Sequence, residues 1–185
     1  NVQDESLRTP LHLALRATGG EKIVQMLLSA KADPDVQDVD GKSALHLAVQ
    51  GRNAKAVRVL LSANADVHIQ DKELRQTVLH AAVTWDGNAR VTRALVGAKA
   101  SVDVQDARGR TALHLAAEEK NQQVVRALLA AGASKALEDE EGAKPDLAFL
   151  GSGDEEEDGT DDGEDASDEE ESGEEESEVD EDAEE

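Results

Sequence analysis

Apolar residues recur along the first 135 residues of the chain in two alternating patterns. The first pattern opens with Thr or Ser and places Leu and His two and three residues later. It begins at Thr9 and returns at Ser43, Thr77 and Thr111, at intervals of 34 residues. The second pattern follows about ten residues later and spaces Val, Leu and Ile as on one face of a helix, over residues 23–28, 56–61, 91–96 and 124–129. Each interval therefore predicts a pair of short helices.

Local signals place the beginnings of the first helices and the connections between pairs. A Ser or Thr before an apolar helix can accept from free backbone N–H groups, and Pro10 at the first helical position removes a donor that would lack a partner. The connecting segments share Ala-Asp or Ala-Ser and then Val-Gln-Asp or Ile-Gln-Asp, as in residues 32–38 and 100–106. We expect these segments to form short extended fingers that end in turns.

These units resemble ankyrin repeats, whose Thr-Pro-Leu-His-x-Ala signature is close to residues 9–14 and their three later copies. The resemblance covers residues 1–150 and implies an all-α solenoid of stacked helix-turn-helix units with β-hairpin-like fingers. Residues 139–150 resemble a degenerate last repeat that Phe149 and Leu150 would pin in place. Lys31 and Lys99 stand where the family usually has glycine, so we expect strained or differently shaped turns there.

Four histidines recur with the repeat, a pattern compatible with a metal ladder, with a relay of catalytic bases or with a structural role. Histidines one repeat apart would lie on helices ~8–10 Å apart, too far to share a metal ion that needs ligands at ~2 Å. The resemblance instead implies that each histidine ties its helix start to the neighbouring turn. The predicted structural set is Thr9, His12, Ser43, His46, Thr77, His80, Thr111 and His114. We predict no metal site, no cofactor and no enzyme activity, since no catalytic or nucleotide-binding motif is present.

Partner-facing positions follow the small apolar pair of each first helix and the finger tips. The third finger has one extra residue between Asp71 and Thr77, which lengthens its tip. Trp85 is the only tryptophan, and aromatic residues are frequent binding hot spots; the alternative is that it fills a gap beneath the longer loop. The candidate residues of the groove and finger tips are Arg16, Gln50, Lys72, Leu74, Arg75, Thr84, Trp85, Arg108, Arg110, Glu118 and Glu119.

The charge of the chain lies almost entirely in its last residues. From residue 154 onward, 22 of 32 residues are Asp or Glu and none is basic, whereas the remainder holds 20 acids and 19 bases. So few apolar residues cannot form a core, which predicts a disordered acidic tail over 151–185. Four serines with an acid three residues later are candidate sites for acidophilic kinases: Ser152, Ser167, Ser172 and Ser177. The chain has no cysteine and no apolar stretch near the ~20 residues that span a bilayer, which fits an intracellular protein, cytoplasmic or nuclear.

These features favour a monomeric adaptor that binds another protein. One alternative is a chaperone or inhibitor whose tail shields a basic nucleic-acid-binding protein. A second is a tail that folds back on the repeats, with Arg90, Arg93, Arg108, Arg110 and Arg126 as docking points. Direct nucleic-acid binding is disfavoured because the repeats have no net positive charge and the tail repels phosphate.

Overall fold

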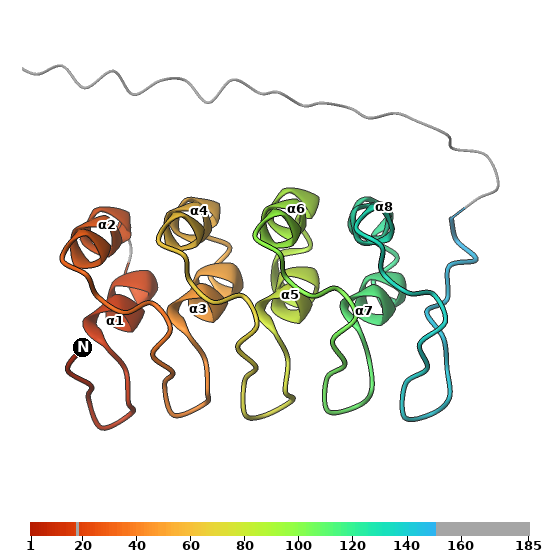
Figure 1. Cartoon of the computed structure of the whole chain (residues 1–185), viewed down its shortest axis with the longest axis horizontal. Coiled ribbons are helices and arrows are strands. Elements are labelled where there is room, and N and C mark those ends of the chain that lie inside the picture. Colours follow the sequence, from red (N-terminus) through yellow and green to blue (C-terminus); the bar gives the residue numbers. More distant parts are fainter. Residues whose placement is uncertain (18, 151–185) are drawn as a thin grey trace, which may run out of the picture. The chain divides into compact units, whose positions relative to one another are not determined.

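The structure is a computed structural model that describes residues 1–17 and 19–150. The chain divides into two units, Asn1–Gly151 and Ser152–Glu185. The predicted tail and the four candidate phosphorylation serines lie outside the described residues. The described residues of the first unit form four helix pairs. The pairs lie side by side, and each is followed or preceded by a finger (Figure 1).

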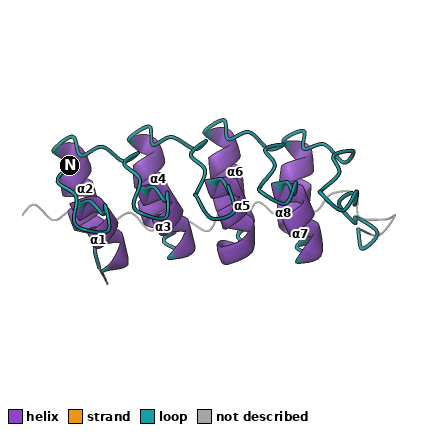
Figure 2. Ribbon diagram, turned by 90° about the horizontal axis from the view of Figure 1, so that it is seen from below, coloured by secondary structure: helices purple, strands orange, loops and turns teal. Residues whose placement is uncertain are grey.

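Each repeat contributes one inner and one outer helix, so the unit has two helical layers with the fingers on the side of the inner layer (Figure 1). Figure 2 shows the same pairs from below. The inner helices are α1 (Pro10–Arg16), α3 (Ala44–Gln50), α5 (Val78–Ala81) with its continuation η1 (Ala82–Asp86), and α7 (Ala112–Glu118). The outer helices are α2 (Glu21–Ser29), α4 (Ala54–Ser62), α6 (Ala89–Gly97) and α8 (Gln122–Ala130). The predicted helix pairs and the all-α class are confirmed.

The hydrophobic core is a continuous layer between the inner and outer helices. Leu45 and Leu113 of the inner layer and Leu60, Leu95 and Leu128 of the outer layer are almost completely buried. The buried core residues extend from Leu11 to Ala133, so the whole core of the described chain lies within the first unit. Small alanine and valine side chains let neighbouring pairs approach closely, and each pair depends on its neighbours for burial.

The fingers consist of turns rather than of regular strands. Within residues 1–17 and 19–150, the only strand-like pairing is an isolated antiparallel bridge between Gln70 and Thr77. Successive fingers are instead joined by single backbone hydrogen bonds, as from the Lys72 N–H to the Asp40 carbonyl (2.9 Å). The hairpin character that the resemblance implied is therefore limited to this loose pairing.

The turns after the outer helices all have the same geometry, whichever residue occupies them. Lys31, Asn64, Lys99 and Gly132 adopt φ values of 61°, 59°, 67° and 87°. Each turn closes with two hydrogen bonds back into its helix, as from Lys99 N–H to Val96 O (2.8 Å) and from Ala100 N–H to Leu95 O (3.0 Å), the pattern of a Schellman cap. The expected difference in shape at the two lysines is absent; what remains is the steric cost of a side chain in the left-handed region.

A fifth finger ends the stack, but no helix pair follows it among the described residues. Asp139 closes this finger, and the Glu140 N–H donates to the Arg108 carbonyl of the previous one (3.0 Å). Residues 143–150 contain no helix, although Phe149 and Leu150 pack against the core as predicted. The last repeat thus keeps the finger and the packing contacts of its predecessors without their helices.

Candidate functional site

A histidine at the start of each inner helix links its own repeat to the next finger. The Thr77 N–H donates to His80 Nδ1 (3.2 Å), and the Thr77 hydroxyl lies 2.9 Å from the same nitrogen. The Nε2 of His80 lies 3.1 Å from the carbonyl oxygen of Arg110, in the following finger. The hydrogen bonds expected of the histidine series are thus present, and the other three histidines, His12, His46 and His114, make the same set.

These partners determine which ring nitrogen of each histidine carries the proton in the neutral form. Because Nδ1 accepts from a backbone N–H, the ring proton must be on Nε2, where it is donated to the carbonyl. Burial lowers the pKa of His46 and of His80, although the carbonyls of Gln76 and Arg110 partly oppose this effect. Burial and these hydrogen bonds therefore favour the neutral form of His46 and His80, which act as structural bridges between repeats.

A second repeated constellation organises each finger and was not among the predicted residues. The Oδ1 of Asp106 accepts from the backbone N–H groups of Arg108 (2.8 Å) and Arg110 (3.0 Å). One residue earlier, the amide of Gln105 donates to the carbonyls of Gly109 (2.6 Å) and Glu138 (2.9 Å), the latter in the next finger. The repeated Gln-Asp of the connecting segments was the signal for this role: it stands at every finger except the last, where Glu138 replaces Gln.

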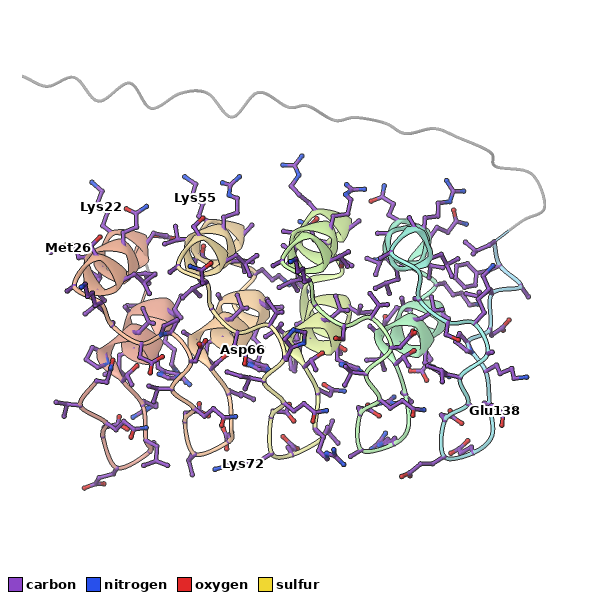
Figure 3. The ribbon with its side chains drawn as sticks, viewed as in Figure 1. Lys22, Met26, Lys55, Asp66, Lys72 and Glu138 are labelled. Carbon is purple, nitrogen blue, oxygen red and sulfur yellow. The ribbon has the colours of Figure 1, made fainter. Side chains whose placement is uncertain are left out.

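The predicted partner residues lie on two parts of one surface, which we call the inner face: the ends of the inner helices and the tips of the fingers. On the helix ends, Thr84, Trp85 and Glu118 are exposed. Lys72 is exposed at the tip of the third finger (Figure 3). The remaining exposed members are Arg16, Arg75, Arg108 and Glu119, whereas Gln50, Leu74 and Arg110 are half-buried.

Two of the predicted contact residues also have roles inside the fold. The guanidinium of Arg110 pairs with Asp106 (3.0 Å) and with Glu118 (3.4 Å), and its side chain is only 16% exposed. The Leu74 carbonyl accepts from the Ala107 N–H of the next finger (2.7 Å). Arg110 thus positions the fourth finger against its inner helix. Its positive charge is already paired within the fold.

Trp85 lies in the one π-helical turn of the described residues, η1. The third repeat has one residue more between His80 and Leu95 than the second has between His46 and Leu60. A π-turn absorbs one inserted residue within a helix, and such turns are frequent at functional sites. Trp85 is 51% exposed, so it does not fill a gap in the core. The turn ends at Gly87, whose φ of 59° is left-handed.

The surroundings of Trp85 combine charge and an unmatched acceptor. Its backbone carbonyl accepts from the Nε of Arg52, 2.8 Å away. Among the buried side-chain oxygen and nitrogen atoms of the described residues, only the Oδ2 of the adjacent Asp86 has no hydrogen-bond partner. Burial raises the pKa of Asp86, and the charge of Arg52 acts in the opposite direction. The inner face therefore presents an exposed indole in η1 and an exposed carboxylate, Glu118, at the end of the next inner helix.

The arrangement defines a class of protein: a helical repeat solenoid with a finger-and-helix surface. Among residues 1–17 and 19–150, no cluster of three potential metal-ligating side chains occurs. In the same part of the chain, no helix has the length and apolar content needed to span a bilayer. Residues 1–71 and 63–139 match the family described as ankyrin repeats (3 copies). The chain belongs to the ankyrin repeat family, whose members are general protein–protein interaction modules.

Proposed function

We propose that the chain is a monomeric, intracellular adaptor that binds a partner protein through its inner face. The observation that supports this most directly is the exposure of Trp85 in a chain with one Trp, one Phe and no Tyr. A large indole at the surface costs solvation free energy that binding would recover. Aromatic residues in the centre of a contact surface account for much of the affinity of protein interfaces.

The position of Trp85 supports the same proposal. It lies in the third of four repeats, with Gln50 of the second repeat and Glu118 of the fourth at equivalent helix ends on either side. The helix positions are held in place because η1 packs on both α3 and α7. A rigid aromatic anchor loses little side-chain entropy on binding.

The experiment is affinity capture from cell extract with the full chain, followed by titration of each captured protein. The variant Trp85→Ala tests the inner face, and Met26→Ala is its control, since Met26 is 70% exposed on an outer helix (Figure 3). We expect Trp85→Ala to weaken binding at least tenfold, as for a hot spot, and Met26→Ala to leave it unchanged. Partners that bind both variants equally would contradict the proposal.

A second candidate function rests on the composition of the tail, with 22 acids in 32 residues. Such a segment could shield a basic nucleic-acid-binding protein, in the manner of a chaperone or inhibitor. Capture by residues 1–185 but not by residues 1–150, lost at high salt, would favour this function. Capture by both chains at high salt would favour the adaptor.

A further inference from the structure

The tips of the first two fingers carry apolar side chains at positions that are mostly glycine or charged in the other fingers. Leu7 occupies the left-handed position of its finger, where the later fingers have Gly41, Arg75, Gly109 and Gly142. Val39 follows Asp38, the equivalent of Asp106, and the same position of the other fingers holds Glu5, Lys72, Ala107 and Glu140. Comparison of the five fingers thus shows that neither Leu7 nor Val39 is required to build a finger.

Leu7 is unfavourable for the folded chain in two respects. Its φ of 59° lies in the left-handed region, where a Cβ crowds the backbone and glycine has no such cost. Its side chain is also 43% exposed to water. An exposed leucine alone carries little information, but backbone strain of this kind collects at functional sites. A contact that the finger itself does not provide would explain a leucine at this position.

Leu7 and Val39 lie on adjacent finger tips. The Val39 N–H donates to the carbonyl of Ser6, the residue before Leu7 (3.0 Å). Val39 is 53% exposed although a finger lies on each side of it (Figure 1). From the third finger, the Lys72 N–H donates to the Asp40 carbonyl (2.9 Å), and the Lys72 Nζ donates to the Val39 carbonyl (3.3 Å). These bonds hold the tip of the second finger in place. We call Leu7 and Val39 the apolar tips.

The charges around the apolar tips are mainly negative. Glu5 and Asp40 are exposed, and the carboxylate of neither has a hydrogen-bond or ion-pair partner among residues 1–17 and 19–150. Of the bases in the same two fingers, Arg8 forms an ion pair within its own finger and Lys42 is half-buried. Lys72 of the third finger supplies one positive charge against the two carboxylates. A basic side chain that approaches the apolar tips would therefore be attracted.

We propose that the apolar tips bind an apolar side chain of the partner that stands next to a lysine or arginine. This inference rests on the proposed function, because it extends the contact on the inner face from the third repeat to the first two fingers. Burial of the two exposed side chains favours the complex. The basic neighbour pairs with Glu5 or Asp40 at the rim, where charge contributes to specificity and to the association rate.

The spacing of the fingers sets the pattern of the partner segment. Successive repeats are ~8–10 Å apart, and three residues of extended polypeptide cover ~10 Å. A segment with leucine at every third residue therefore places one apolar side chain at each tip. The two carboxylates disfavour an acidic occupant, including residues 154–185 of the same chain, and they disfavour a phosphate backbone for the same reason.

The test is methyl NMR of the full chain, titrated at physiological salt with the peptide Gly-Leu-Lys-Gly-Leu-Lys-Gly. The signals of Leu7 and Val39 report on the apolar tips. The signal of Val179 reports on binding to residues 154–185, where it is the only valine. Two control peptides separate the contributions, since serine replaces leucine in one and glutamate replaces lysine in the other.

Three variants of the chain complete the test. Leu7→Gly removes the side chain and the strain together, and Val39→Thr changes the polarity of the second tip without changing its shape. Lys31→Gly is the matched control, because Lys31 has a similar left-handed φ (61°) in the turn after α2. We expect the first two variants to weaken peptide binding by about fivefold or more and Lys31→Gly by less than about twofold. The melting temperature of Leu7→Gly should equal that of wild type or exceed it by up to about 4 °C.

Several outcomes would overturn the proposal. Equal binding of the leucine and serine peptides, with a shift of Val179 alone, would place the binding in the acidic residues 154–185. Equal binding of the glutamate peptide would exclude a basic partner. A lower melting temperature in Leu7→Gly would show that Leu7 serves the finger rather than a contact. Trp85→Ala should leave binding of this peptide unchanged, so the capture experiment and this titration can fail independently.

Discussion

The Nε of Arg52 donates a hydrogen bond of 2.8 Å to the backbone carbonyl of Trp85, one repeat further along the stack. This bond crosses from the turn after α3 to the π-turn that carries the exposed indole. Trp85 lies in the last turn of its inner helix, where carbonyls have no partner within the helix, so a donor from the neighbouring repeat holds the turn in place. Arg52 thus acts on the inner face through the position of Trp85.

The first prediction is that Arg52→Ala loosens Trp85 without unfolding the repeats. Because Trp85 is the only tryptophan, fluorescence anisotropy and acrylamide quenching report on this side chain alone. We expect faster local motion and partner affinity reduced by roughly twofold to tenfold, the worth of one net hydrogen bond. Lys120→Ala is the control, since Lys120 has the same φ of 52° in the equivalent turn of the fourth repeat. Identical fluorescence in wild type and Arg52→Ala would show that the bond does not position the indole.

The second prediction concerns the histidine bridges. His80→Ala leaves the buried Thr77 N–H and the Arg110 carbonyl without partners, which costs about 1–3 kcal/mol for each group. We expect the free energy of unfolding, measured by urea titration and circular dichroism, to fall by about 2–4 kcal/mol. His68→Ala, at an exposed position, should change it by less than about 0.5 kcal/mol. A loss below 1 kcal/mol at His80 would contradict the structural role.

The third prediction is a loss of stability in mild acid. Burial lowers the pKa of His46 and His80 in the folded chain, whereas the unfolded chain keeps the ordinary value of about 6.5. In the window between these values the unfolded state binds more protons, so its free energy falls relative to the folded state. The stability is therefore complete above about pH 6.5 and declines as the pH falls towards the lowered folded values.

The measurement is the urea midpoint at pH 7.5 and at pH 5.5. We expect a lower midpoint at pH 5.5 in wild type and an equal decrease in His68→Asn, which removes only an exposed histidine. A midpoint that stays constant or rises would show that the buried histidines accept protons without cost.

The fourth prediction uses the left-handed turns as a matched pair. Lys99 has a φ of 67° and Gly132 has a φ of 87° at the same position of the next repeat. Lys99→Gly should stabilise the chain by about 0.5–1 kcal/mol, because relief of the steric cost exceeds the added freedom of the unfolded chain. Gly132→Lys should destabilise it by a similar amount through φ alone, since a Cβ at Gly132 would meet no atom within 4 Å. Thermal melts of the two variants that shift in the same direction would refute this account.

The repeat pattern in the sequence determined the helix pairs and the histidine bridges, since both depend on residues that recur at fixed spacing. It could not locate the π-turn. Repeats one and three each have one extra residue between their helices, but the first repeat ends its inner helix at Arg16 and the third continues through η1. Whether the extra residue lengthens the inner helix or the connection after it depends on packing between neighbouring repeats. The period of the sequence does not describe this packing.

The distribution of charge shows a second limit of the sequence analysis. Summed along the chain, the bases and acids of residues 1–150 almost cancel. The bases of the outer helices nevertheless recur at two positions: Lys22, Lys55 and Arg90 are second residues of their helices, and Arg58, Arg93 and Arg126 are fifth residues. This regularity becomes visible only when the four outer helices are aligned by repeat.

The last prediction compares one position in two repeats. Ile23 and Val91 are the third residues of their outer helices; Val91 is 4% exposed because α4 packs against α6, whereas Ile23, in the first repeat, is 50% exposed. Val91→Gln buries an amide without partners and removes apolar contacts, so it should cost about 2–4 kcal/mol. Ile23→Gln should change the free energy of unfolding by less than about 0.5 kcal/mol. Ile23→Gln should also reduce self-association at high concentration, because Leu13, Ile23 and Met26 are all exposed apolar side chains of the first repeat. Urea titration and light scattering measure the two effects separately. Equal destabilisation by the two substitutions would mean that the first repeat is covered in solution by a group that the described chain does not provide.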